Sequence, residues 1–168
     1  MKEISINELN ENAFDLIKNQ WAIITVKTKD KVNGMTANWV QLGHLWNNYV
    51  ISLYVRKQRY TYEYIDNTNE YSVCFFDNKY KEQLTYLGTK SGKDYNKLKE
   101  CNMTTNKFNN VDYINEAKLV FICEKIYVDD IKPNNFIDNN INDNCYPNKD
   151  YHRVYVSKIK HVLINEGE

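Results

Sequence analysis

Basic and hydroxyl side chains gather in a predicted turn between Tyr54 and Tyr62. Arg56 and Arg59 carry guanidinium groups, which can bind two phosphate oxygens at once, and Thr61 adds a hydroxyl. A helix that begins near Arg59 would contribute free N–H groups and a dipole that favours an anion. The segment therefore predicts a phosphate site. An exposed turn with solvated charges is the alternative.

Small and polar residues occupy the strand segment from Val32 to Trp39, where a half-buried strand usually carries bulky side chains. Such residues let a ligand approach the backbone closely. Thr36 and Asn38 share one face of the strand and offer a hydroxyl and an amide, while Trp39 adds apolar area and one N–H donor. Taken alone, the segment is explained more simply as a strand end with a core tryptophan.

Two later segments carry further polar groups. In the loop from Leu87 to Asp94, Lys90 and Ser91 would be a second anion contact, unless the loop only joins a helix C-cap to an aspartate N-cap. The last predicted strand opens with His152 and Arg153 on opposite faces, so one of them would face a site. An edge-strand histidine with satisfied hydrogen bonds is the alternative.

Several common sites are missing from the sequence. Neither G-x-G-x-x-G nor G-x-x-x-x-G-K-[ST] occurs, and five glycines leave little for a phosphate cradle. His44, His152 and His161 are far apart, the four cysteines form no C-x-x-C pair, and there is no G-x-S-x-G elbow. We therefore predict neither a metal site nor a hydrolase triad.

Length and composition indicate one globular domain over residues 1–168. Lys and Arg number 22 and balance 22 Asp and Glu, so no overall positive field attracts nucleic acid or an anionic membrane. No stretch approaches the roughly 20 apolar residues of a membrane span, and Met1–Asn19 lacks the apolar core of a signal peptide. We expect a cytoplasmic protein with reduced thiols.

Hydrophobic periodicity predicts six strands and a few short helices. The strands are expected at residues 21–26, 35–39, 49–55, 71–76, 117–128 and 151–164. Helices are expected at residues 7–18 with Asn7 as its cap, from about 59, at 79–87 and at 94–100. The Asn-rich segment 129–149 is predicted to be loop with at most one helical turn around Phe136. This pattern favours a mainly antiparallel barrel with peripheral helices.

Four motifs in order resemble one known family over nearly the whole chain. They are Met35–Trp39, Val55–Arg56 with Gln58–Thr61, Leu87–Gly92 and Asp150–Arg153, and they are similar to those of the flavin reductase-like, flavoredoxin-type proteins. The resemblance implies an antiparallel, Greek-key split β-barrel that binds FMN. It also implies a homodimer with the FMN site near the subunit interface.

The resemblance assigns roles to residues by position. Those expected along the isoalloxazine ring and ribityl chain are Thr36, Ala37, Asn38 and Trp39. Those expected to hold the phosphate are Arg56, Arg59 and Thr61, with Lys90 and Ser91 as weaker candidates; Gln58 and Tyr60 are expected among the other cofactor-binding residues. His152 matches the family's histidine near the flavin or the partner subunit.

The implied function is a flavin-dependent oxidoreductase that passes electrons from NAD(P)H or a redox partner to flavin or another acceptor, with FMN doing the redox chemistry. Lys57, Lys93 and Ser157–Lys158 depart from the family's usual residues and bear on the nicotinamide side. An FMN-binding electron carrier or sensor is therefore an alternative. A nucleic-acid-binding small barrel, with tyrosines near the basic turn as stacking platforms, is a weaker alternative because the net charge is zero.

Overall fold

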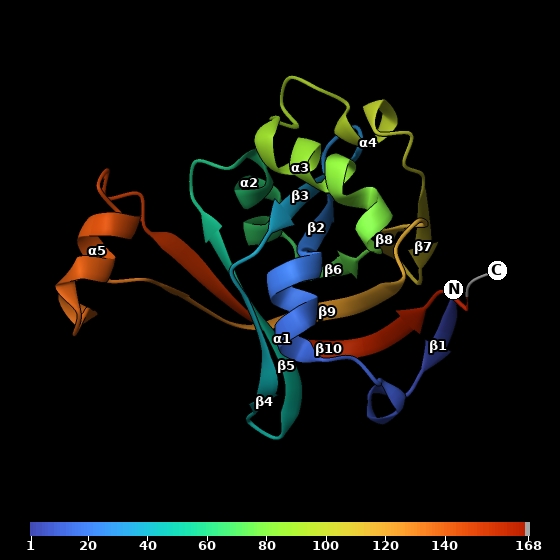
Figure 1. Ribbon diagram of the computed structural model, residues 1–168, viewed down its shortest axis with the longest axis horizontal. Helices are drawn as coiled ribbons and strands as arrows, with labels where there is room; N and C mark the ends of the chain where they lie inside the picture. The colour runs from blue at the N-terminus through green and yellow to red at the C-terminus, as the bar shows by residue number, and fades with distance from the viewer. Residues whose placement is uncertain (167–168) are drawn as a thin grey trace.

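An antiparallel sheet forms the centre of the molecule in the computed structural model, which describes residues 1–166 (Figure 1). Its strands lie in the order β3-β2-β6-β9-β10-β5-β4, and β1 adds to β10. Their bounds are β1 Lys2–Ile4, β2 Ala22–Lys27, β3 Val32–Ala37, β4 Val40–Leu45, β5 Asn48–Arg56, β6 Glu70–Phe75, β9 Leu119–Asp130 and β10 His152–Ile164. A separate hairpin consists of β7 Thr105–Phe108 and β8 Val111–Ile114.

The sheet is buried on both faces, because two apolar clusters pack against it. Successive strand side chains point to opposite faces, so Ile23 belongs to one cluster and Ile24 to the other. The cluster around Ile24 includes Tyr71, Phe121 and Tyr155, all at most 1% exposed. The cluster around Ile23 lies under the helices and the β7–β8 hairpin.

Three helices cover one end of the sheet, as Figure 1 shows. They are α2 Tyr60–Asn67, α3 Lys81–Thr89 and α4 Lys97–Glu100, with a 3₁₀ turn at Asn78–Tyr80 before α3. Leu84, Leu87 and Leu98 anchor α3 and α4 in the apolar cluster around Ile23. No helix of the described residues is long and apolar enough to cross a membrane.

An arm projects from the body between β9 and β10, at the left of Figure 1. It spans residues 131–151 and contains a 3₁₀ turn at Pro133–Asn135 and helix α5 at Asn139–Cys145, which Asp138 caps. The prediction of at most one helical turn in this segment is therefore wrong, since α5 has seven residues. Low apolar content concealed the helix, because little of it packs into a core.

The mainly antiparallel sheet with short peripheral helices is confirmed. The predicted helix over 7–18 is wrong: a 3₁₀ turn at Ile6–Glu8 is followed by α1 Ala13–Asp15 and a π-helical turn Leu16–Gln20, and Asn12 caps α1 in place of Asn7. Strands β1, β4, β7 and β8 were not predicted. β4 pairs with β5 through a tight turn in which Trp46 and Asn47 have positive φ, without the usual Asn-Gly signal.

Candidate functional site

A groove crosses the molecule where β3, the end of β5 and the start of α2 meet. It consists of two cavities of about 560 and 230 Å³, which share Met35, Arg56 and Arg59. The larger cavity is lined by Met35, Arg56, Gln58, Arg59, Tyr60, Thr61, Leu87, Thr89, Lys90, Ser91, Gly92 and Lys97. The smaller is lined by Met35, Thr36, Ala37, Asn38, Trp39, Tyr54, Val55, Arg56, Arg59 and His152.

All twelve predicted site residues line this groove. The five from the strand end and the last strand lie in the smaller cavity, and the seven from the basic turn and the loop after α3 lie in the larger one; Arg56 and Arg59 lie in both. The hydroxyl of Thr36 donates to the carbonyl oxygen of Leu84, so it also fastens α3 to β3. Thus segments far apart in the sequence form one continuous surface.

Lys97 lies buried at the floor of the larger cavity and is only 4% exposed. Its Nζ donates a 2.7 Å hydrogen bond to the carbonyl oxygen of Leu87. Burial, and then the positive charge of Arg59, lower the pKa of Lys97 to about 8. Among the described residues, no carboxylate forms an ion pair with Lys97. A buried ammonium without a counter-charge is costly, and an anion in the cavity would offset that cost.

Arg59 extends the positive field of Lys97 toward solvent. It is the N-cap residue of α2, its side chain makes no cap hydrogen bond, and its Nη1 donates to the carbonyl oxygen of Gly88 at 3.2 Å. Nor does any described residue form an ion pair with Arg59. The larger cavity therefore has two uncompensated positive charges beside the start of an eight-residue helix.

The loop 88–92 approaches β3 very closely. Asn33 donates from Nδ2 to the buried hydroxyl of Thr61 at 2.8 Å, which ties β3 to the first turn of α2. A Cβ atom on Gly92 would lie 2.0 Å from the Oδ1 of Asn33, so only glycine fits at this position. Gly92 itself lines the larger cavity.

Aromatic rings line the smaller cavity. The rings of Trp39 and His152 lie 4.5 Å apart with an angle of 32° between their planes. His152 is buried, and its Nδ1 shares a 2.9 Å hydrogen bond with the hydroxyl of Tyr146. Burial, then the charge of Arg56, lower the pKa of His152 to about 4, so its imidazole is neutral at neutral pH. This part of the groove suits a flat, uncharged ring system.

Arg56 fastens the arm to the edge of the groove. It forms an ion pair with Asp150, donates from Nη2 to the carbonyl oxygen of Cys145 at 3.0 Å, and lies over the ring of Tyr146 at 5.4 Å. Gln58 donates to the same carboxylate at 2.8 Å. Both side chains line the groove, but Asp150 already compensates the charge of Arg56.

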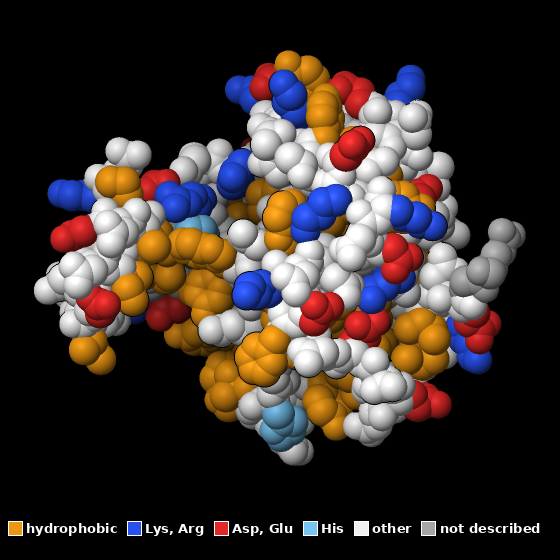
Figure 2. Space-filling view, viewed as in Figure 1, with side chains coloured by type: hydrophobic (Ala, Val, Ile, Leu, Met, Phe, Trp, Pro, Cys, Tyr) orange, Lys and Arg blue, Asp and Glu red, His pale blue; other side chains and the backbone are white. Residues whose placement is uncertain are grey.

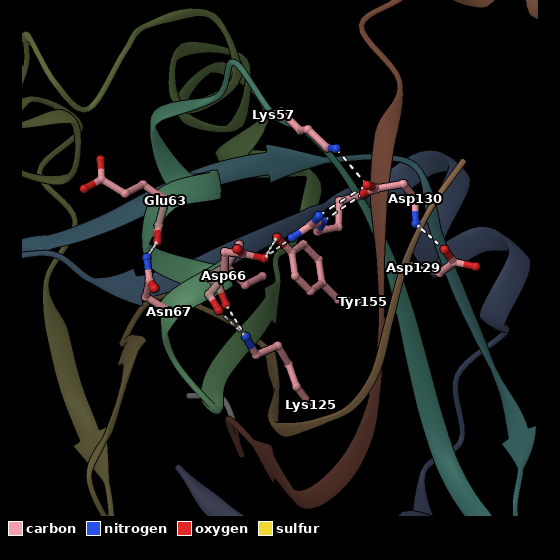
Figure 3. Close-up of polar contacts among 10 residues, drawn as sticks. Lys57, Glu63, Asp66, Asn67, Lys125, Asp129, Asp130 and Tyr155 are labelled. Atoms are coloured by element: carbon pink, nitrogen blue, oxygen red, sulfur yellow. Dashed lines mark hydrogen bonds and ion pairs between the residues drawn. The ribbon is translucent and has the colours of Figure 1, made fainter. Parts of the chain in front are cut away.

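Arg153 lies outside the groove and bonds to Asp66 and Asp130, two of the residues labelled in Figure 3. It bridges Asp66, at the end of α2, and Asp130, at the end of β9, with N–O distances of 2.9 and 2.8 Å. Tyr155 and Lys125 bond to the same stretch of α2. The network positions α2, whose first turn borders the groove.

The sequence did not identify Lys97 as a site residue. It lies in the predicted helix 94–100, where a lysine normally faces water, and its burial depends on how α4 packs on β3. Gly34 permits that packing, because a Cβ there would lie 3.2 Å from the Cδ2 of Leu98. In the sequence, the position of Lys97 next to the apolar Leu98 was the one local sign of its burial.

Comparisons with known proteins agree with this fold. The model of the family described as "Flavin reductase like domain" matches residues 14–168, and no curated protein matches the sequence. Flavoredoxin from Desulfovibrio vulgaris (Miyazaki F) is 19% identical, with a TM-score of 0.69 over 88% of this chain and 70% of that one.

Two other solved structures are similar to this chain. An FMN-binding protein from Thermus thermophilus with bound p-hydroxybenzaldehyde is 17% identical, with a TM-score of 0.69 over 99% of this chain and 83% of that one. The FMN-binding domain of a flavin reductases-like enzyme from Shewanella baltica OS155 is 14% identical, with a TM-score of 0.68 over 96% and 75% of the chains. The predicted split-barrel class is therefore confirmed. The chain belongs to the flavin reductase-like domain family.

Proposed function

We propose that the groove binds FMN, with its phosphate in the larger cavity and its isoalloxazine ring in the smaller one. The observation that carries this proposal is the pair of unpaired cations at one end of the groove, Lys97 and Arg59, opposite the neutral rings of Trp39 and His152. FMN has the same arrangement of a dianion at one end and a flat apolar ring at the other. The donor set therefore fits this cofactor.

The phosphate would contact Lys97 and Arg59 first. Ser91, Lys90 and the first turn of α2 border the same cavity and add neutral and charged donors. The hydroxyl of Thr61 accepts a hydrogen bond from Asn33, which holds this residue in place at the start of α2. Arg56, already paired with Asp150, would lie along the ribityl chain and keep the arm closed over it.

The flavin ring would lie against Ala37, Asn38 and Trp39, where the strand end leaves its backbone accessible. When bound, FMN supplies the hydride and electron transfer chemistry, and the protein supplies position, electrostatics and access. The chain's own residues exclude water from one side of the ring and keep an uncharged imidazole next to it. We propose a flavin reductase-like oxidoreductase that takes electrons from NAD(P)H.

Two departures from the family's usual residues have structural roles away from the groove. Ser157 is fully buried and its hydroxyl bonds to that of Tyr71 at 2.6 Å in the core. Lys57 pairs with Asp130 at 2.7 Å. Neither departure therefore argues against an oxidoreductase.

A second copy of the chain would complete the site. An apolar cavity of about 280 Å³ lies between the arm and the body and shares Trp39 and Tyr54 with the groove. Figure 2 shows hydrophobic side chains gathered on and beside the arm. Ile137 and Ile141 on the arm are among the exposed large hydrophobics of the chain. Such exposed apolar area is typical of an interface, so we propose a homodimer.

The test is an absorbance spectrum from about 300 to 550 nm of protein mixed with FMN and freed of excess by gel filtration, with the mass of the eluting species measured by light scattering. We expect flavin bands that co-elute with a dimer and that bleach within seconds to minutes after addition of NADH or NADPH. Flavin that binds without bleaching would favour the carrier function. A colourless protein would contradict FMN binding altogether.

A further inference from the structure

Tyr146 occupies an unusual place for a residue of the arm. It is the C-cap of α5, is only 4% exposed, and brings its hydroxyl within 2.9 Å of the Nδ1 of His152. Its ring stacks on Tyr151 at 4.8 Å and meets Trp39 edge-on at 6.3 Å. The arm therefore contributes a polar atom to the aromatic end of the groove.

We propose that Tyr146 is a positioning residue that holds His152 as the neutral tautomer with its hydrogen on Nε2, so that this N–H is available to a flavin in the groove. The tautomer is a property of this chain alone. The contact with flavin rests on the proposed function.

The direction of the hydrogen bond follows from the surroundings of the phenol oxygen. Burial raises the pKa of Tyr146, against the charge of Arg56, so the hydroxyl keeps its hydrogen. Among the described residues, the Nδ1 of His152 is the one hydrogen-bond partner of this hydroxyl, so the hydroxyl's own hydrogen donates to Nδ1. A neutral histidine has one donor and one acceptor nitrogen, so its hydrogen then lies on Nε2.

The charged groups around His152 keep the ring neutral. Arg56, from β5, and Arg59, at the start of α2, disfavour a second proton, while Asp150 favours it but is itself paired with Arg56. No described residue bonds to Nε2, and this atom is not among the fully buried polar atoms without a partner. Since His152 lines the smaller cavity, Nε2 is the nitrogen left for a ligand.

Tyr146 is itself held in place by the arm's attachment. Arg56 lies over its ring and bonds to the neighbouring carbonyl of Cys145. Movement of the arm would thus separate the hydroxyl of Tyr146 from Nδ1, and His152 could then adopt either neutral tautomer. A neutral N–H donor beside the ring would stabilise negative charge there without adding a positive charge to the groove.

The test is long-range ¹H–¹⁵N NMR of the histidines in flavin-free protein between about pH 5.5 and 8. In the wild type we expect His152 in a single neutral tautomer, with unprotonated Nδ1 and protonated Nε2 throughout. In Tyr146→Phe we expect a mixture of the two neutral tautomers, with the ring still uncharged, because burial and Arg56 continue to lower the pKa of His152. A wild-type spectrum with the hydrogen on Nδ1 would overturn the proposal without the need for any variant.

Tyr151→Phe is the matched control, because its hydroxyl bonds to Asn142 at 2.8 Å and not to His152. We expect it to keep the wild-type tautomer. An unchanged tautomer in Tyr146→Phe, or an equal change in Tyr151→Phe, would contradict the positioning role. With FMN bound, Tyr146→Phe should lower the flavin reduction potential, because the Nε2–H would be present in only part of the molecules. Because the tautomer is measured without flavin, failure of FMN binding would leave that result intact.

Discussion

The Nζ of Lys97 donates a 2.7 Å hydrogen bond to the carbonyl oxygen of Leu87, which joins α4 to α3 at the floor of the groove. An ammonium group has three hydrogens, so this bond leaves two for a ligand. Burial, and then the charge of Arg59, lower the pKa of Lys97, and neither residue has a counter-charge among the described residues. The phosphate of the proposed FMN would offset the cost of holding both charges there.

FMN affinity should fall as pH rises through about 8, where Lys97 loses its proton. Stability of the flavin-free protein should change in the opposite direction. The pKa of Lys97 in the folded protein lies below the ordinary 10.5, so the unfolded chain binds more protons between these two values. The free energy of unfolding therefore rises with pH across that interval, by about 3 kcal/mol at most. FMN titrations at pH 7 to 10 would measure the affinity, and urea unfolding over the same range would measure the stability of the flavin-free protein. Affinity that is flat over this range would place the phosphate elsewhere.

Gly92→Ala should weaken FMN binding and destabilise the fold. The added Cβ would lie 2.0 Å from the Oδ1 of Asn33, so the Asn33–Thr61 hydrogen bond would have to shift. We expect a loss of about 1–3 kcal/mol in the free energy of unfolding. Gly43→Ala is the control, since nothing lies within 4 Å of its added Cβ. Equal effects of the two substitutions on FMN affinity would contradict the close approach of the loop.

Arg56→Met should release the arm from the body. The variant loses the ion pair to Asp150 and the bond to the carbonyl of Cys145, while the methionine keeps the stem's apolar contacts. We expect faster cleavage within residues 131–151 by a non-specific protease, by about tenfold, since charged hydrogen bonds contribute about 1.5–3 kcal/mol. Lys57→Met, which loses the exposed pair with Asp130, should leave the cleavage rate near wild type.

Arg153→Met should destabilise the fold without touching the groove directly. Arg153 lowers the pKa of Asp130 to about 2, so this pair contributes stability above about pH 4 that is lost as pH falls through 2. We expect a cost of about 1–3 kcal/mol at pH 7, between those of exposed and buried pairs. Lys160→Met, which breaks the exposed pair with Glu70, should lower the free energy of unfolding much less than Arg153→Met does. Chemical unfolding of the wild type and both variants, at pH 7 and again near pH 2, would compare these costs.

The sheet was predictable wherever strands carry continuous apolar runs, as in β2, β6 and β9. β4 was missed because only Val40 of its six residues is buried, and α5 because its polar sequence gains little from packing. The groove residues were named because four motifs in order resemble one family, although each motif alone has a simpler explanation. Lys97 was not found, since its burial is a tertiary effect of Gly34 and Leu98. Nor could the sequence pair Arg56 with Asp150, 94 residues later.

The most direct test of the central claim compares FMN with riboflavin, which lacks the phosphate, by calorimetric titration of wild type, Lys97→Met and Lys99→Met. We expect Lys97→Met to bind FMN about 10- to 100-fold more weakly, as the loss of one charged contact predicts, and riboflavin as the wild type does. Lys99, also on α4 but exposed, serves as the control, and Lys99→Met should match the wild type for both ligands. Equal affinity of Lys97→Met and wild type for FMN would contradict the account.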